Sequence, residues 1–213
     1  MRCLLPALAL LILPAAASDA LEAFGLRWQV PIAADWKLES HEGVPTLELL
    51  IARPSTQPRR PTQYALAETL PYHRLDLQLE VKQEALAARN RRTSLILVYA
   101  WRGPDHFNYA HLSVDTARQA AHHNGIFHVY GGDRVRISSI EGPATLTSEQ
   151  WHKVRLQYDA SSHRVDVFVN GQTSPSMQAV DMSLGAGRFG VGSFFDLGSF
   201  RNLRVSGDAV KSR

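Results

Sequence analysis

Cysteine is almost absent from this chain of 213 residues, in which Cys3 is the only one. Cys3 lies inside an apolar N-terminal segment that we expect to be removed, so the mature chain has no thiol. Disulfide bonds, catalysis by a thiolate and zinc sites built from cysteine are therefore excluded. A lipoprotein cysteine would directly follow the apolar segment, where this chain has Ala17 and Ser18. The domain must be stabilised by its core alone.

Long apolar runs are also missing after residue 20, since no later segment approaches the ~20 apolar residues that a membrane-spanning helix needs. The first twenty residues, MRCLLPALALLILPAAASDA, place Arg2 before a run of Leu, Ile and Ala and end in Ala15, Ala16 and Ala17. This order is typical of a secretory signal peptide. We therefore expect residues 1–20 to be a signal peptide and the mature protein to be secreted or periplasmic. An uncleaved membrane anchor is the alternative.

No charge of one sign dominates, because 23 basic residues stand against 20 acidic ones. Nucleic acid is not an expected partner, since its binding needs a concentrated basic face with interleaved aromatic residues. Two local basic clusters remain: Arg53, Arg59 and Arg60 in a proline-rich loop, and residues 89–92. Each is either a solvated loop or a rim that attracts an acidic polysaccharide.

Alternation of apolar and polar residues dominates the rest of the chain. Residues 153–158 and 164–169 have period two, and Asn170-Gly171 supplies a dipeptide that tolerates positive φ. Leu75, Leu77, Leu79 and Val81 likewise form one face of a strand whose other face is polar. In residues 94–101 both alternating sets are apolar, which predicts a strand buried on both sides. We interpret residues 82–92 as a loop or a short helix.

The last third of the chain resembles a known superfamily. Trp151, Val154, Val169-Asn170-Gly171 and 190–193 (GVGS) match the strand motifs of concanavalin A-like, laminin G-like domains, and DHFNYAHLSVD and HHNGIFHVYGG resemble secreted bacterial members. The resemblance covers residues 94–206. It implies an all-β fold, an antiparallel two-sheet jelly-roll sandwich. We expect one domain over residues 21–208 and a short tail at 209–213. Lectins, glycosidases, polysaccharide lyases and adhesion modules share this fold, so function depends on the site.

Candidate ligand-binding residues come first from FNYAHLSVD. In glycan-handling members of this superfamily the ligand lies across the concave sheet, and alternation places Tyr109 and His111 on one face of a central strand. We expect them to contact the ligand there, together with Tyr99 or Trp101 on the neighbouring strand. The alternative is a half-buried aromatic cluster with a hydrogen-bonded histidine.

A second group lies in the loop before residue 125. His122, His123 and Asn124 follow His111 and Asp115 closely in sequence, and we include His122 and Asn124 among the ligand-binding candidates. A neutral imidazole here can act as a general base or a metal ligand. The spacing matches no short zinc motif, and exposed loop histidines without a role are the alternative.

Enzyme motifs of the superfamily are missing. Family 16 glycosidases need a strand reading E-x-D-x-x-E, whereas LDLQLEVKQE places Asp76 and Glu80 in the wrong order and spacing. Alginate-lyase motifs are also absent, although 3-keto-disaccharide hydrolases have a looser pattern. We interpret Asp76 and Glu80 as a solvated sheet face.

Asp196, in SFFDLGSF, lies where jelly rolls of this kind place a carboxylate for structural calcium, to which Asp35 or Glu22 could contribute. A turn-forming aspartate before Gly198 is the alternative. We expect no other cofactor.

The sequence thus favours an exported, non-catalytic carbohydrate-binding module whose partner is a carbohydrate or a cell-surface glycan. A glycoside hydrolase or polysaccharide lyase of the same fold, or an adhesion module that binds protein, is the alternative. The oligomeric state is not predicted.

Overall fold

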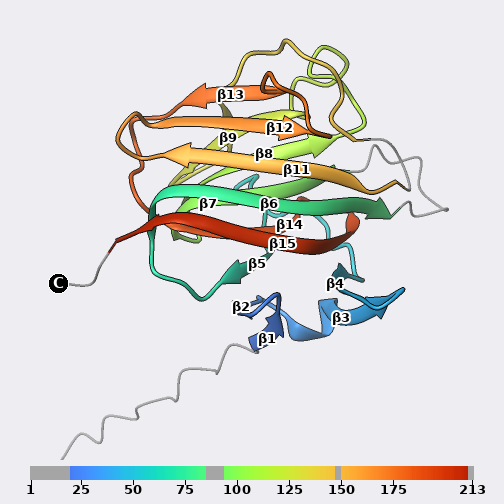
Figure 1. Cartoon of the computed structure of the whole chain (residues 1–213). Helices are drawn as coiled ribbons and strands as arrows, with labels where there is room; N and C mark the ends of the chain where they lie inside the picture. The colour runs from blue at the N-terminus through green and yellow to red at the C-terminus, as the bar shows by residue number, and fades with distance from the viewer. Residues whose placement is uncertain (1–19, 85–93, 147–149, 211–213) are drawn as a thin grey trace, which may run out of the picture.

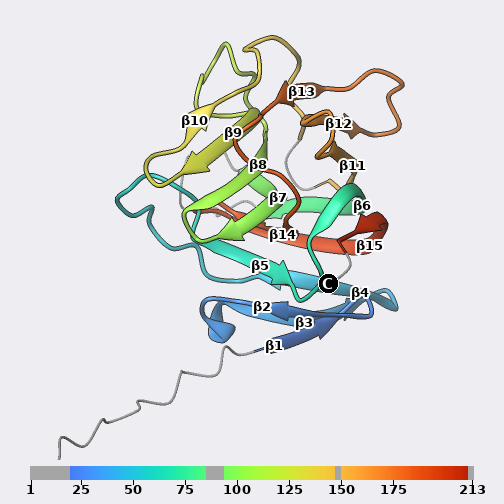
Figure 2. The same cartoon turned by 90° about the vertical axis from the view of Figure 1, so that its left-hand side faces the viewer.

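The computed structural model describes residues 20–84, 94–146 and 150–210. Over these residues the chain forms two antiparallel β-sheets that pack face to face (Figures 1 and 2). The one helical segment within the described ranges is a single 3₁₀ turn, η1, at Ala33–Asp35. The prediction of an all-β, two-sheet sandwich is confirmed.

Sheet A has eight strands in the described part of the chain. Its order across the sheet is β1 (Ala20–Ala23), β2 (Leu26–Gln29), β5 (Gln63–Ala67), β14 (Arg188–Ser193), β7 (Ser94–Gly103), β8 (His106–Ser113), β9 (Gly125–Tyr130) and β10 (Val135–Arg136).

Sheet B has seven strands, counted over the same described residues. Its order is β13 (Met177–Val180), β12 (Arg164–Val169), β11 (His152–Asp159), β6 (Tyr72–Glu84), β15 (Leu197–Ala209), β4 (Val44–Leu49) and β3 (Trp36–His41). Strands β6 and β15 are the longest of this sheet and cross the middle of the face that Figure 1 presents to the viewer.

The main core lies between the two sheets. From sheet B, the alternating residues Leu75, Leu77 and Leu79 of β6 are buried, and Leu156 of β11 and Val167 of β12 are fully buried beside them. Burial of each such side chain is worth about 1.5–3 kcal/mol relative to exposure. The alternation predicted for these strands therefore defines which face of sheet B is dry and which is polar.

Strand β7 is buried on both faces from Ser94 to Ala100, as predicted from its two apolar sets. One set, with Leu95, Leu97 and Tyr99, belongs to the main core, while Ile96 and Val98 belong to a second apolar cluster on the outer side of sheet A. Sheet A therefore has apolar side chains on both of its faces.

The signal-peptide prediction falls almost entirely on residues 1–19, which lie outside the described residues. Of the loop or short helix predicted at 82–92, residues 82–84 instead continue strand β6, and the rest lies outside the described residues. Of the tail predicted at 209–213, Ala209 is the last residue of β15, and residues 211–213 lie outside the described residues. Among the residues described, no helical segment has the length and apolar character that crossing a lipid bilayer demands.

Candidate functional site

The outer face of sheet A carries the strand on which the sequence placed the ligand site. Tyr109 and His111 share this face with Phe107, as the alternation along β8 predicted. They belong to or border a cluster that we call the aromatic layer: Tyr64, Leu66, Ile96, Val98, Phe107, Tyr109, Phe127 and Val129. Tyr109 stacks on Phe127 at a ring-centroid distance of 5.4 Å. All members of the layer are buried.

Two segments are joined at the edge of this layer. The backbone N–H of Arg59, in the proline-rich loop between β4 and β5, donates to Asp133 Oδ1 at 2.7 Å, and the N–H of Arg134 donates to the Arg59 carbonyl at 3.0 Å. Arg134 Nη1 then donates to the hydroxyl of Tyr109 at 3.0 Å. Figure 2 shows the loop before β5 running toward the turn between β9 and β10.

These contacts correct one prediction. Tyr109 is 0% exposed and His111 is 1% exposed, so neither ring presents a surface on which a sugar can stack. The physical reason is that alternation shows which residues share a face, whereas a distant loop decides whether that face meets solvent. The alternative interpretation from the sequence, an aromatic cluster with a hydrogen-bonded histidine, describes the observed arrangement.

Of Tyr99 and Trp101, which the sequence offered as alternatives beside Tyr109 and His111, only Trp101 lies on the outer face of sheet A. Ala100 between them has φ of 51°, and the pairing of β7 with β8 shifts register after Tyr99. This β-bulge turns Tyr99 into the main core, 5.0 Å from the ring of Tyr158, and turns Trp101 onto the aromatic layer. Trp101 is half-buried and its indole N–H donates to the hydroxyl of Tyr64 at 3.2 Å.

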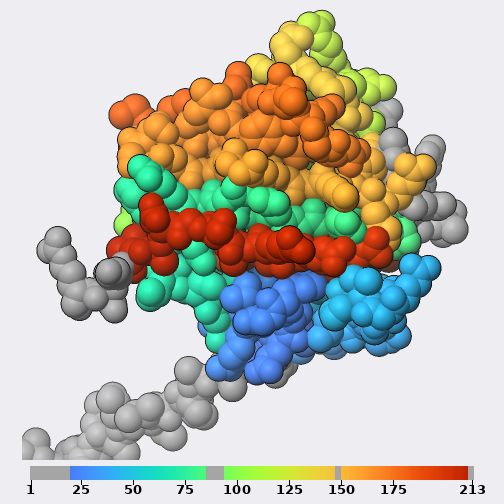
Figure 3. Space-filling model, in the orientation of Figure 1, coloured from blue at the N-terminus to red at the C-terminus, as the bar shows by residue number. Residues whose placement is uncertain are grey.

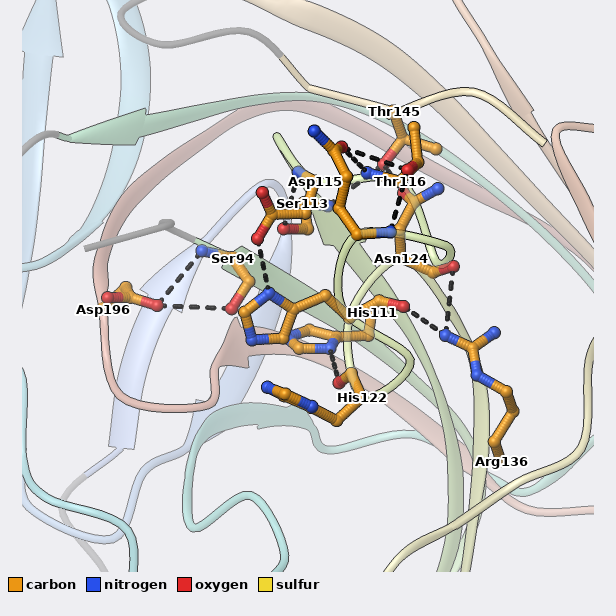
Figure 4. Close-up of polar contacts among 12 residues, drawn as sticks. Ser94, His111, Ser113, Asp115, Thr116, His122, Asn124, Arg136, Thr145 and Asp196 are labelled. Carbon is orange, nitrogen blue, oxygen red and sulfur yellow. Dashed lines mark hydrogen bonds and ion pairs between the residues drawn. The ribbon is translucent and has the colours of Figure 1, made fainter. Parts of the chain in front are cut away.

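Histidines gather at one end of the aromatic layer (Figure 4). The Nδ1–H of His111 donates to the carbonyl oxygen of His122 at 3.1 Å, which leaves Nε2 as a buried acceptor without a hydrogen-bond partner among the described residues. His123 lies 5.3 Å from the His111 ring, and its Nδ1 bonds Asp115 Oδ2 at 2.9 Å. Burial, followed by the nearby charges of Arg134 and His123, holds the pKa of His111 well below its ordinary value.

The histidine cluster does not form a group of metal ligands by distance. Among the described residues, the one set of three His, Asp or Glu side chains close enough to share an ion is Glu39, His41 and Glu48 on the exposed hairpin of β3 and β4. His122 itself is exposed, at the mouth of the cluster. Whether it contacts a ligand stays a prediction.

Asn124 has a structural role. Its φ is 42°, its Nδ2 donates to the Pro143 carbonyl at 2.6 Å, and its Oδ1 accepts from the Thr145 hydroxyl at 2.6 Å. The side chain is buried and engaged at both ends. It holds the loop between β10 and β11 against the start of β9. The side chain is therefore not placed to bond a ligand, contrary to what the sequence had suggested.

Asp196 is buried and caps the start of β7. Its Oδ2 accepts from the backbone N–H of Ser94 at 3.1 Å and from the Ser94 hydroxyl at 3.2 Å, and its own N–H donates to Ser193 Oγ at 2.8 Å. Asp35, the suggested helper, instead accepts two hydrogen bonds from the guanidinium of Arg53. The calcium site at Asp196 stays a prediction.

The outer face of sheet B is open, and the sequence analysis treated it as merely solvated. In Figure 3 the strands β11, β6 and β15 lie at the surface toward the viewer. Cross-strand register aligns four outward side chains in one row across four strands: Phe168 pairs with Arg155, Arg155 with Gln78, and Gln78 with Arg204. We call this set, Phe168, Arg155, Gln78 and Arg204, the polar row.

A groove of about 830 Å³ lies along the polar row. Its walls also include Lys153 and Glu80 in the adjacent register, the turn residues Gly171, Gln172 and Thr173, and Asn202 of β15. Asn202 has φ of 53° in a bulged stretch of β15, where pairing with β6 shifts between Arg201 and Arg204. The groove thus combines one aromatic ring, several amides and several cations on a rigid sheet.

The carboxylates beside this groove are held by arginines. Arg155 forms an ion pair with Asp76, and Arg201 Nε lies 2.7 Å from Glu80 Oε2. The hydrogen bonds from Arg155 hold the pKa of Asp76 below its usual value. Arg201 also lies 4.0 Å above the ring of Trp151. The open face is therefore ordered by charge pairs between arginines and carboxylates.

A further polar cluster, not anticipated from the sequence, lies between β9 and the loop after β13. His128 Nδ1 lies 3.2 Å from both Asp181 Oδ2 and Ser183 Oγ. A nucleophilic triad needs the serine and the carboxylate on opposite ring nitrogens, whereas here both lie at Nδ1. These contacts consequently join β9 to the loop after β13 and do not activate the serine.

Comparisons with known proteins show similarity in fold and not in sequence. No model of a known protein family matches the chain, and no curated protein is detectably similar to it. Among solved structures, the carbohydrate binding module CBM66 from Bacillus subtilis aligns with a TM-score of 0.58 at 12% identity, covering 84% of this chain and 95% of that one.

Two further structures have the same arrangement. A protein of unknown function with a galectin-like fold from Bacillus subtilis aligns at a TM-score of 0.50 and 14% identity, covering 83% of this chain and 88% of that one. A xylan β-1,4-xylosidase from Bacillus halodurans C-125 aligns at 0.52 and 10% identity, covering 89% of this chain but 38% of that one. The chain therefore has the concanavalin A-like jelly-roll fold.

Proposed function

We propose that the protein binds a glycan in the groove along the polar row of sheet B and does not cleave it. The observation that carries the proposal is the groove itself, in which Phe168, Arg155, Gln78 and Arg204 stand in one register across four strands. The role of this face in binding is the part of the proposal that differs from the sequence prediction.

The chemistry of the row suits a sugar chain. An aromatic ring offers an apolar surface to the C–H face of a pyranose. Side-chain amides can both donate to and accept from sugar hydroxyls, and guanidinium groups donate to them. Strands spaced about 4.8 Å apart repeat these groups at an interval comparable to that of successive sugars. A preformed groove on a sheet also loses little entropy on binding.

The state of the carboxylates supports binding without cleavage. A glycosidase needs one carboxyl group that stays protonated near neutral pH and a second one facing it across the scissile bond. Asp76 has a lowered pKa and is bonded to Arg155, while Glu80 is bonded to Arg201. Neither is available as a general acid in this arrangement.

The catalytic alternative, a hydrolase or lyase that uses the histidine cluster, depends on His111 and on the pair of His123 with Asp115. This pair has the geometry of an oriented base. His111 and His123 are 1% and 7% exposed, so a substrate would reach them only if the covering loops moved. The open groove supports the binding proposal more directly.

Two findings outside the site agree with the proposal. The solved CBM66 structure, which shares the fold, is named as a carbohydrate binding module. The N-terminal segment with Ala15, Ala16 and Ala17 supports export, where cell-surface and environmental glycans are met. We include export in the proposal, and N-terminal sequencing of protein recovered outside the cytoplasm should begin at Ser18 or Leu21.

A glycan array combined with a turnover assay tests the proposal. The protein should retain at least one glycan reproducibly, and incubation with that glycan should release neither reducing ends nor unsaturated sugars. Release of either product at a rate proportional to protein concentration would replace the binding function with an enzymatic one. Retention of no glycan would remove the proposal altogether.

A further inference from the structure

The edge of the aromatic layer on sheet A, opposite the polar row, carries a second concentration of cations. Arg59 and Arg134 both lie over the ring of Phe194, with their guanidinium carbons 5.7 Å and 4.2 Å from its centroid. Arg134 also lies 4.7 Å from the centroid of Phe127. The backbone hydrogen bond between Arg134 and Arg59 fixes the two side chains beside one another.

Most hydrogen-bond donors of these two groups are unused. No side-chain hydrogen bond from Arg59 occurs within the described residues, and Arg134 makes one, to Tyr109. The neighbouring Arg136 differs, because its guanidinium donates to carbonyls of the loop at 121–124 and to Ser138 and so ties that loop down. Arg59 and Arg134 therefore have guanidinium N–H groups free to bond a ligand, whereas those of Arg136 are engaged.

Carboxylates do not neutralise this pair. In the described ranges, neither Arg59 nor Arg134 has an acidic side chain within ion-pair distance of its guanidinium. The nearest acid along the chain, Asp133, accepts the backbone N–H of Arg59 instead. Two guanidinium groups held over one ring repel each other, and that cost would be relieved by an anion between them.

His122 completes the cluster from the other side. It is exposed, and its pKa is lowered by partial burial and by the charges of His123, Arg134 and Arg59. Ring contacts place it near the arginines: the His122 ring lies 4.4 Å from that of His123, His123 lies 5.3 Å from His111, and His111 lies 6.1 Å from Phe194, the ring over which both guanidinium groups lie. Figure 4 shows His122 beside His111, at the same end of the layer.

We propose that Arg59, Arg134 and His122 form a binding site for an oxyanion, either inorganic sulfate or the sulfate or carboxylate group of an acidic saccharide. Guanidinium groups recognise such anions through paired, charge-assisted hydrogen bonds, and an imidazole N–H adds a third donor. The ring of Phe194 holds the cations in place and excludes water from one side of the site. The site lies on the outer face of sheet A, so it is independent of the groove on sheet B.

Isothermal titration with a heparin-derived tetrasaccharide, its desulfated counterpart and sodium sulfate tests this site. The parent should bind the sulfated tetrasaccharide, and the desulfated one at least about fivefold more weakly, since loss of a charge-assisted contact costs roughly that much. Arg59→Gln should weaken the sulfated ligand by a similar factor. Sodium sulfate is then added as a competitor for the tetrasaccharide, with sodium chloride at the same ionic strength as the control. Displacement by sulfate alone indicates recognition of the oxyanion, and no displacement indicates recognition of the saccharide that carries it.

Arg118→Gln is the matched control. Arg118 is also an exposed arginine on this end of the molecule, but it is paired with Glu141 at 2.7 Å. This variant should bind the sulfated tetrasaccharide like the parent, and both variants should keep the melting temperature of the parent. An equal loss of affinity in Arg118→Gln would reduce the effect to general surface charge and overturn the site. Equal binding of sulfated and desulfated ligands would overturn it as well.

A third variant separates this site from the glycan groove. Phe168→Ala removes a ring of the polar row and should leave binding of the sulfated tetrasaccharide unchanged. Failure of the oxyanion site is therefore distinguishable from failure of the glycan groove.

Discussion

Among single residues, His111 shows how burial changes the role of a side chain. It was a candidate for ligand binding, yet in the structure it lies among Tyr109, Phe127 and Phe194 with its Nδ1–H bonded to a backbone carbonyl. Such a histidine stays neutral in the folded protein because burial disfavours the imidazolium, whereas in the unfolded chain it ionises near its ordinary pKa.

The pH dependence of stability follows from this difference. The folded pKa of His111 lies below 6.5, its ordinary value, so below pH 6.5 the unfolded chain binds a proton that the folded one does not. The free energy of unfolding should therefore fall by about 1.4 kcal/mol per pH unit as the pH drops from about 6.5 toward the folded pKa. Above pH 6.5 this residue should contribute no slope.

Urea denaturation between pH 7.5 and pH 5 measures that slope. His111→Phe removes the proton site and should flatten the dependence, while the same change at the exposed His73 should leave it as in the parent. A parent protein whose unfolding free energy is constant between pH 6.5 and pH 5 would mean that His111 ionises normally and is not sealed from water.

Local sequence patterns predicted some side-chain positions and missed others for identifiable reasons. The alternation along β8 correctly predicted that Tyr109 and His111 share one face of the strand. The choice between Tyr99 and Trp101 was left open, because Ala100 gives no sign in the sequence that it adopts a positive φ. Trp151, which matched the strand motif of the superfamily, is half-buried beneath Arg201, a contact between residues fifty positions apart that no local pattern reveals.

At the scale of elements, the close approach of strands β14 and β5 explains the G-V-G-S motif. A Cβ atom on Gly192 would lie 2.2 Å from the carbonyl oxygen of Gln63, and one on Gly190 would lie 2.5 Å from that of Ala65. Both oxygens belong to β5, the neighbouring strand. Glycine is required here because β5 and β14 approach too closely for a side chain, and the obstructing atoms are backbone.

Gly192→Ala should accordingly lower the unfolding free energy by at least about 2 kcal/mol, because overpacking against backbone cannot be relieved by a rotamer change. Gly185→Ala is the control, since a Cβ atom there meets nothing within 4 Å. Thermal unfolding of both variants measures the difference. Equal melting temperatures for the two would show that β5 and β14 are farther apart than described.

Element positions were largely predictable, since period-two alternation requires only a dry face and a wet face. Residues 153–158 and 164–169 form β11 and β12, and Asn170 and Gly171 both have positive φ, as predicted. The path of the proline-rich loop was not predictable, because its position depends on hydrogen bonds to Asp133 and Arg134, which are far along the chain.

For the whole molecule, the two outer faces of the sandwich have opposite characters. The outer face of sheet A carries the buried aromatic layer with Arg59, Arg134 and His122 at its edge, whereas that of sheet B is polar and carries the groove. The sequence predicted a sandwich with a glycan site but placed the site on β8 of sheet A. That placement was made from a superfamily likeness in one strand, and no local pattern reveals that Phe168, Arg155, Gln78 and Arg204 meet in one row.

The central claim is that a glycan binds along the polar row, and the most direct measurement is the affinity of the array-selected glycan for two matched aromatic variants. Phe168→Ala removes the ring in the groove, and Tyr130→Ala removes a ring that is 57% exposed on β9, outside it. Isothermal titration should show at least about a tenfold loss for Phe168→Ala, as expected when a central aromatic contact is removed, and an unchanged affinity for Tyr130→Ala. Unchanged affinity in Phe168→Ala with a large loss in Tyr130→Ala would place the glycan elsewhere and contradict the account.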